Sequence, residues 1–180
     1  MATAYIVDAV RTAGGRRGGK LASWHPVDLA AATLDALVAR SGIDGTKVDD
    51  VIMGCVTQAG QQAMQVGRNA VLAAKNLPDS VPAVTIDRQC GSSQQAMQFA
   101  AQAVMSGTMD VVIAAGVESM TRVPMGSNAM FHMKEGLGHY KSQRLDEKYP
   151  GIMFSQFMGA EMIVKKHGFT KDVLDQFALN

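Results

Sequence analysis

The chain has 180 residues, of which 47% are apolar, which is enough for a packed core of one domain or slightly more. Seventeen Lys and Arg residues balance sixteen Asp and Glu residues, so the net charge of +1 gives no overall field that would attract nucleic acid or an anionic membrane. The only cysteines are Cys55 and Cys90, and neither a CxxC pair nor a His at ligand spacing occurs. We therefore expect no nucleic-acid partner, no disulfide framework and no zinc site.

Short β-rich runs alternate with helical patterns along the first two thirds of the chain. Strands are predicted at 5–10, 51–56, 83–87 and 111–116, where nearly continuous apolar, β-branched sequence is typical of strands covered on both faces. Helices are predicted from Pro26 to a stop near Gly42, over 65–76 and over 91–106. This alternation predicts an α/β fold with right-handed crossovers and a mostly parallel sheet.

The two ends of the chain carry different signals. No charged and apolar leader precedes the first predicted strand, and no apolar run approaches the roughly 18 residues of a membrane span, so we expect a cytoplasmic protein without a membrane partner. Residues 118–154 show no clear period and are interpreted as an excursion over the sheet. Helices are predicted over 155–167 and after Thr170, and the second has no stop signal before Asn180, as in a truncated chain.

The loop after the first predicted strand resembles a phosphate-binding loop, with Gly14 followed after four residues by Gly19 and Lys20. Such a loop requires Ser or Thr next, to hold magnesium, and a helix that begins at the lysine. Here Leu21 follows, and Pro26 marks a later helix start. The interpretation as a mobile basic loop is therefore favoured over an NTPase site.

The two cysteines occupy different contexts. Cys55 lies in an apolar strand run, where a free cysteine usually acts as a small buried hydrophobe. Cys90 lies between a predicted strand and the predicted helix 91–106, so the helix-terminal amides and the positive end of the macrodipole would favour its thiolate. On position alone, a buried structural thiol and a catalytic nucleophile are about equally supported.

The predicted helix after Cys90 contains no charged side chain. Because nothing from Gln89 to Met109 is charged, and Gln94, Gln98 and Gln102 form one stripe, we expect an interior helix whose dipole is little screened by water. A cysteine nucleophile usually needs a base and an oxyanion site. The four histidines, His25, His132, His139 and His167, fit solvated or capping positions, so the catalytic set is incomplete in this sequence.

Several segments together resemble the amino-terminal part of a thiolase, an acyl-CoA C-acyltransferase, over all 180 residues. They are IVDAVRTAGGRRGGKLA at the first strand and loop, MGCVTQAGQQAMQVGRNAVLAA at the second strand and helix, DRQCGSSQQA around Cys90, VIAAGVESMTRVPM at the fourth strand, and FMGAEMIVKKHGFTKDVLDQFAL near the end. The resemblance implies a thiolase-like fold whose core half spans 1–118 and whose inserted loop domain starts at 119 and is truncated at 180. It also implies a second, similar half and a dimer or tetramer.

The resemblance assigns roles to individual residues. Cys90 would attack the carbonyl carbon of an acyl-CoA thioester and become the acyl-enzyme, and its own backbone N–H would form part of an oxyanion hole. Met158 matches a methionine that lines the acyl pocket, and the turn Glu118, Ser119 and Met120 matches a supporting turn near the site. The family's histidine base, its second cysteine and an Asn-containing segment lie in the second half, outside this sequence. No metal or redox cofactor is implied, with the coenzyme A thioester as substrate.

Four positions depart from the family pattern. Ser93 replaces a common glycine and Gln94 a common Leu or Met, so we expect this helix to fit differently against the neighbouring backbone. Asp87 replaces a frequent asparagine and would oppose thiolate formation if it faces the sulfur. Phe157 occupies a position that is histidine in short-chain members, which leaves longer or bulkier 3-ketoacyl chains open.

The sequence thus predicts an acyltransferase that works by thiolysis of 3-ketoacyl-CoA or by Claisen condensation of acyl-CoAs, in fatty acid metabolism. Two alternatives stay open. The chain could be a catalytically incomplete fragment or assembly module, which by itself turns over poorly, or a thiol-based sensor that uses an activated Cys90.

Overall fold

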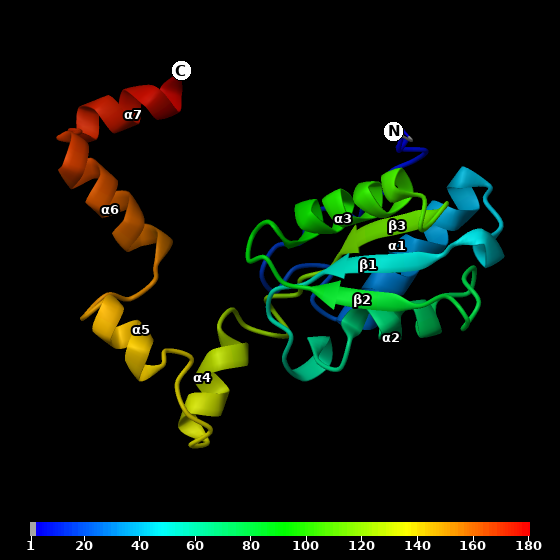
Figure 1. Ribbon diagram of the computed structural model, residues 1–180, viewed down its shortest axis with the longest axis horizontal. Helices are drawn as coiled ribbons and strands as arrows, with labels where there is room; N and C mark the ends of the chain where they lie inside the picture. Colours follow the sequence, from blue (N-terminus) through cyan, green and yellow to red (C-terminus); the bar gives the residue numbers. More distant parts are fainter. Residues whose placement is uncertain (1–2) are drawn as a thin grey trace. The chain divides into compact units, whose positions relative to one another are not determined.

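The computed structural model describes residues 3–180, which form two compact units (Figure 1). The first unit ends at Leu137, and the second runs from Gly138 to Asn180. Residues 119–137 belong to the first unit, so this division does not coincide with the expected start of an inserted domain at residue 119. Where the inserted domain begins stays a prediction.

A three-stranded parallel sheet organises the first unit. Its strands are β1 (Asp50–Gly54), β2 (Ala83–Ile86) and β3 (Val112–Gly116), in the spatial order β2-β1-β3. Val51 of β1 pairs with Ala83 of β2 on one side and with Ile113 of β3 on the other. The α/β class, the parallel sheet and three of the four predicted strands are thereby confirmed.

Helices cover both faces of this sheet. Helices α1 (Pro26–Ser41) and α2 (Val66–Ala73) enclose the larger core on one face, and α3 (Ser92–Ser106) packs on the other face against β1 and β3. Successive residues of a strand point to opposite faces, so Val51 and Met53 enter the larger core while Ile52 joins Ala96 and Ala100 of α3. Each helix follows a strand or precedes one, as the alternating pattern predicts.

The predicted strand at 5–10 is wrong. Residues 3–49 contain no strand, and the side chains of Tyr5, Ile6 and Val7 are 82%, 76% and 83% exposed. A strand is held by hydrogen bonds to a neighbouring strand, and this segment pairs with neither edge of the described sheet. It is tied instead through Asp8, which accepts a hydrogen bond from Nε of Arg40 at 2.8 Å.

The expectation of an interior helix holds for only one side of α3 in the described chain. Helix α3 buries only the side that faces the sheet, where Ser92, Gln95, Ala96 and Ala100 lie. Met97 and Phe99 on the other side are exposed, as are the three glutamines of the predicted stripe. The sheet supplies cover on one side of the helix only, so an uncharged surface remains uncovered.

The remaining elements are short. The first unit also contains the single-turn 3₁₀ helices η1 (Gly45–Lys47) and η2 (Gly60–Gln62) and the helix α4 (Ser127–Lys134). The second unit consists of α5 (Gln143–Lys148), α6 (Gln156–His167) and α7 (Lys171–Leu179), none of which contains a buried residue. Helices α4 and α5 lie where the sequence shows no period. None of the helices within residues 3–180 is long and apolar enough to cross a membrane.

Candidate functional site

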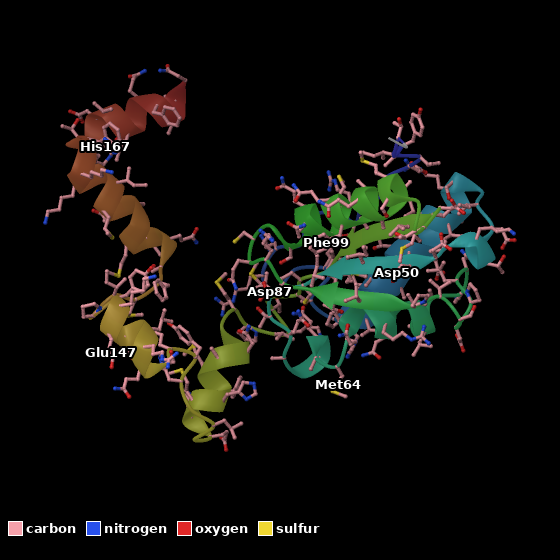
Figure 2. The ribbon with its side chains drawn as sticks, in the orientation of Figure 1. Asp50, Met64, Asp87, Phe99, Glu147 and His167 are labelled. Atoms are coloured by element: carbon pink, nitrogen blue, oxygen red, sulfur yellow. The ribbon has the colours of Figure 1, made fainter. Side chains whose placement is uncertain are left out.

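The carboxyl ends of the three strands bring the chemically interesting residues to one edge of the sheet. Cys55 directly follows β1, Asp87 directly follows β2, and Glu118 lies two residues after β3. The N–H of Cys55 donates to the carbonyl of Ile86 at 3.0 Å, which ties the end of β1 to the end of β2. Asp87, labelled in Figure 2, lies beside the tips of the strand arrows. Ligands of open α/β sheets bind at this edge.

Cys90 lies on a tight turn between β2 and α3 and is exposed. Gln89 before it has a φ of 46°, in the left-handed region that non-glycine residues rarely adopt. Helix α3 begins at Ser92 with Gly91 as its N-cap, one residue later than predicted. Cys90 is therefore presented just outside the amino end of the helix, where the helix dipole is positive.

Two glycines allow α3 to approach the strand ends closely. A β-carbon at Gly54, the last residue of β1, would lie 2.5 Å from the backbone nitrogen of Ser93. A β-carbon at Gly116, the last residue of β3, would lie 1.9 Å from Oγ of Ser93. A larger residue at Gly54 would meet the backbone of α3 and move the helix, whereas at Gly116 it would meet the side chain of Ser93. Both glycines therefore allow the close approach of the amino end of α3 and of the turn before it.

Glu118 fixes the loop that follows β1. Its carboxylate accepts hydrogen bonds from the backbone N–H of Val56 at 2.7 Å and of Thr57 at 3.2 Å, and from Nε2 of Gln62 at 3.0 Å. Gln62 is fully buried, and it also donates to the carbonyl of Thr57 and accepts from the N–H of Ser119. Sequence reasoning missed Gln62, because nothing local distinguishes it from the glutamines around it.

Cys55 is buried beside this network, with 1% of its surface exposed. Burial, followed by the negative charge of Glu118, raises the pKa of its thiol to about 12. Its thiol is therefore neutral and inaccessible at ordinary pH. The structural role predicted for Cys55 agrees with this environment.

The other predicted site residues are placed as follows. Ser119 is half-buried and bonded to Gln62, and Met120 is 56% exposed. Met158 belongs to the second unit, where it lines an open surface hollow of about 300 Å³ with residues 152–155, Gly159 and Met162. Cys90 and Glu118 therefore lie at the same edge of the sheet in the first unit, whereas Met158 belongs to the second unit.

The histidines do not provide a base for Cys90 through any hydrogen bond within residues 3–180. His25 caps α1 by accepting from the N–H of Val27, and His139 accepts from the N–H of Lys141. The same residues contain no cluster of His, Cys, Asp and Glu that could hold a metal ion. Among the described residues, this edge of the sheet carries the thiol of Cys90, backbone N–H groups and the carboxylates of Asp87 and Glu118.

Comparison with known proteins decides the family. A family model described as the N-terminal domain of thiolase matches residues 4–180. The chain belongs to the thiolase family. This thiolase chain is 45% identical, over 99% of its length, to a steroid 3-ketoacyl-CoA thiolase, FadA6, of Mycobacterium tuberculosis. It is 41% identical to 3-ketoacyl-CoA thiolases of Serratia proteamaculans, over 99% of its length, and of Salmonella typhimurium, over 96%.

The chain spans less than half the length of these curated relatives. It covers 44% of the Mycobacterium and Serratia proteins and 42% of the Salmonella protein. The match thus concerns the amino-terminal portion of a thiolase, as the sequence motifs predict.

Proposed function

We propose that the protein is an acyl-CoA C-acyltransferase in which Cys90 forms an acyl-thioester intermediate. The observation that carries the proposal is the contrast between the two thiols at the carboxyl edge of the sheet. Cys90 is exposed on a constrained turn at the amino end of α3, whereas Cys55 is buried and its pKa is raised to about 12. Because the thiolate is the nucleophile, only Cys90 suits attack on a thioester.

In the first half-reaction of the condensation direction, Sγ of Cys90 forms a bond to the thioester carbonyl carbon of an acyl-CoA, and the carbonyl oxygen becomes an oxyanion. Within residues 3–180, the backbone N–H of Cys90 donates to no protein acceptor, which leaves it free to donate to that oxygen. The bond between the carbonyl carbon and the sulfur of coenzyme A then breaks, and coenzyme A leaves as the thiolate. The acyl group remains on Cys90.

In condensation, the carbanion of acetyl-CoA then attacks the acyl-enzyme and forms a carbon–carbon bond. In thiolysis, the acyl-enzyme forms instead when Sγ of Cys90 attacks the 3-keto carbon of a 3-ketoacyl-CoA; the bond between C2 and C3 breaks, and acetyl-CoA leaves after its carbanion takes a proton. The thiolate of coenzyme A then attacks this acyl-enzyme and carries the acyl group away. In both directions the bond to Sγ of Cys90 breaks and the thiolate is regenerated. The names of the relatives support 3-ketoacyl-CoA thioesters as the substrate class. Phe157 in place of a histidine supports longer or bulkier acyl chains.

The remaining site and domain assignments are part of this proposal. Met158 would line the acyl pocket, and the apolar side chains around the open hollow that it lines in the second unit support this role. Glu118, Ser119 and Met120 would support the site, Glu118 by holding the loop after β1. We further propose a core half at 1–118, an inserted domain from 119, a homo-oligomeric intact protein that carries the base and second cysteine, a cytoplasmic location, and a role in fatty acid metabolism.

The test is incubation of the 180-residue chain with acetyl-CoA and with a longer acyl-CoA, followed by peptide mass measurement. We expect an acyl adduct on the peptide that contains Cys90, its loss in C90S, and its retention in C55A. Absence of the adduct on a folded chain would contradict the proposal. Sulfenic acid formation with dilute peroxide in the same chain, without any acylation, would favour the thiol sensor instead.

A further inference from the structure

We propose that Asp87 and Ser92 are positioning residues whose side chains hold the turn that carries Cys90 from its two ends. This inference rests on the proposed function, because it concerns how the acyl-accepting sulfur is aimed. The observation that supports it is independent of the proposed function, because it consists of hydrogen bonds between these two side chains and the backbone of the turn.

Ser92 holds the turn from the helix side. Its hydroxyl, in a side chain with 4% of its surface exposed, accepts from the backbone N–H of Arg88 at 2.9 Å and donates to the carbonyl of Gln89 at 2.6 Å. One oxygen atom therefore satisfies a donor and an acceptor on two successive residues before Cys90. Both hydrogen bonds are partly buried, and the carbonyl of Gln89 also accepts from the backbone N–H of Ser92 at 3.0 Å, so the hydroxyl favours the conformation in which all three bonds form.

Asp87 holds the turn from the strand side. Its Oδ1 accepts from the backbone N–H of Gln89 at 2.7 Å, two residues later, which is the geometry of an Asx turn. Gln89 is the residue with the positive φ of 46°, and a non-glycine residue keeps such a conformation only when its surroundings impose it. The bond from Asp87 to this N–H is one of the contacts that impose it.

The two side chains thus bond both polar groups of Gln89, the residue whose backbone conformation sets the direction of Cys90. The requirement at position 87 is an acceptor two residues before Gln89, which an asparagine also provides and an alanine does not. The requirement at position 92 is a hydroxyl that both accepts and donates. Position 87 should therefore tolerate asparagine but not alanine, and position 92 should not tolerate alanine.

The experiment compares Asp87→Ala, Asp87→Asn and Ser92→Ala in the full 180-residue chain. Acylation of Cys90 by acetyl-CoA requires the sulfur and the N–H donors to meet one carbonyl group, whereas alkylation by iodoacetamide requires only an accessible thiolate. We expect D87A and S92A to slow acylation by about tenfold, the usual effect of one lost hydrogen bond in the reacting geometry, and to change alkylation by less than about threefold. D87N should keep acylation within about threefold of the unchanged chain.

Backbone amide exchange measures the same bonds without any reaction at Cys90. We expect faster exchange of the Gln89 amide in D87A but not in D87N, and faster exchange of the Arg88 amide in S92A. The matched controls are S93A, whose hydroxyl makes no hydrogen bond within residues 3–180, and D110N, an exposed carboxylate at the opposite edge of the sheet. Both should leave acylation and exchange at 88 and 89 unchanged.

The outcomes separate this inference from the proposed function. If D87N behaves like D87A in both measurements, or if exchange at 88 and 89 is the same in all variants, the positioning role is wrong. If the unchanged chain is folded but never acylated, the proposed function fails, and amide exchange still decides the positioning role. If S92A does not fold, the Asp87 pair decides it, since D87A and D87N change an exposed side chain.

Discussion

The ends of β1 and β2 each place a cysteine at the same edge of the sheet, and the two environments are opposite. Cys55 after β1 is enclosed by the core, Glu118 and the loop that Glu118 holds, so its pKa rises to about 12. Cys90 after β2 stands on a turn outside the amino end of α3 and is exposed. The loop after β1 therefore buries Cys55, whereas the turn after β2 exposes Cys90 to solvent.

The contrast indicates that the backbone around a cysteine decides whether its thiol is exposed or buried. Both cysteines follow strands of the same sheet, and strand position alone does not separate them. What separates them is whether the chain continues into a loop closed by the exposed carboxylate of Glu118 and the buried Gln62, or into a turn just outside the amino end of α3. The following predictions test that contrast, beginning with the largest expected effect.

The first prediction concerns selective labelling of the two thiols. With a pKa of about 12, Cys55 has a thiolate fraction on the order of 10⁻⁴ at pH 8, so Cys90 should react with iodoacetamide on the order of a thousandfold faster. Peptide mass measurement over time gives the two rates, and denatured protein, in which both thiols react alike, is the control. Preferential labelling of Cys55 in the folded chain would overturn the comparison.

The second prediction concerns the carboxylate that closes the Cys55 loop. Glu118→Ala leaves the N–H groups of Val56 and Thr57 and one bond of Gln62 without a partner, so we expect a loss of about 2 to 3 kcal/mol in the free energy of unfolding. Urea unfolding measures it, with the exposed Glu161→Ala as control, expected within about 0.5 kcal/mol of the unchanged chain. A stability effect of E118A as small as that of E161A would show that the network does not hold the loop.

The third prediction concerns the approach of α3 to the strand ends. Gly116→Ala should destabilise the protein by about 1 to 3 kcal/mol because its β-carbon meets Oγ of Ser93, and Ser93→Gly should recover most of this loss. Gly54→Ala meets the backbone of residues 92 and 93 instead, so Ser93→Gly should not rescue it. A double-mutant cycle by urea unfolding measures the coupling. Equal rescue of G54A and G116A would contradict the described contacts.

The fourth prediction concerns alkaline pH. Because the folded pKa of Cys55 lies above that of an unfolded thiol, its contribution to stability is fully present below about pH 8.5 and is lost as the pH rises toward 12. Over that window the stability difference between the unchanged chain and C55A should shrink by at most about 1.4 kcal/mol per pH unit. E118Q should lower the pH at which Cys55 becomes reactive, since it removes a negative charge that raises this pKa. A pH-independent difference would contradict the buried, neutral thiol.

Much of the first unit could be predicted from the sequence because its signals are local. Continuous β-branched runs identified β1, β2 and β3, and glycine stops at Gly42 and Gly107 fixed the ends of α1 and α3, where both glycines adopt positive φ. The position of Cys90 between β2 and α3 followed from these boundaries. The family then followed from motifs that surround them.

The parts that could not be predicted depend on contacts between distant residues. Tyr5, Ile6 and Val7 have strand-like sequence, but a strand forms only with a paired neighbour, which the described sheet does not give them. Gln62 and Glu118 are 56 residues apart and meet only because β1 and β3 end side by side. The uncharged sequence of α3 indicated burial, but which side is covered depends on the layers around it.

The hydroxyl of Ser92 has a consequence for the length of the turn that bears Cys90. Ser92 is both the first residue of α3 and the residue that closes the turn, so the orientation of the helix and the orientation of the thiol share one origin. Since each helical residue advances by about 100°, one inserted residue between 87 and 92 would either turn Ala96 and Ala100 away from the sheet or break the closure. We therefore expect homologous chains to keep the number of residues between positions 87 and 92 fixed.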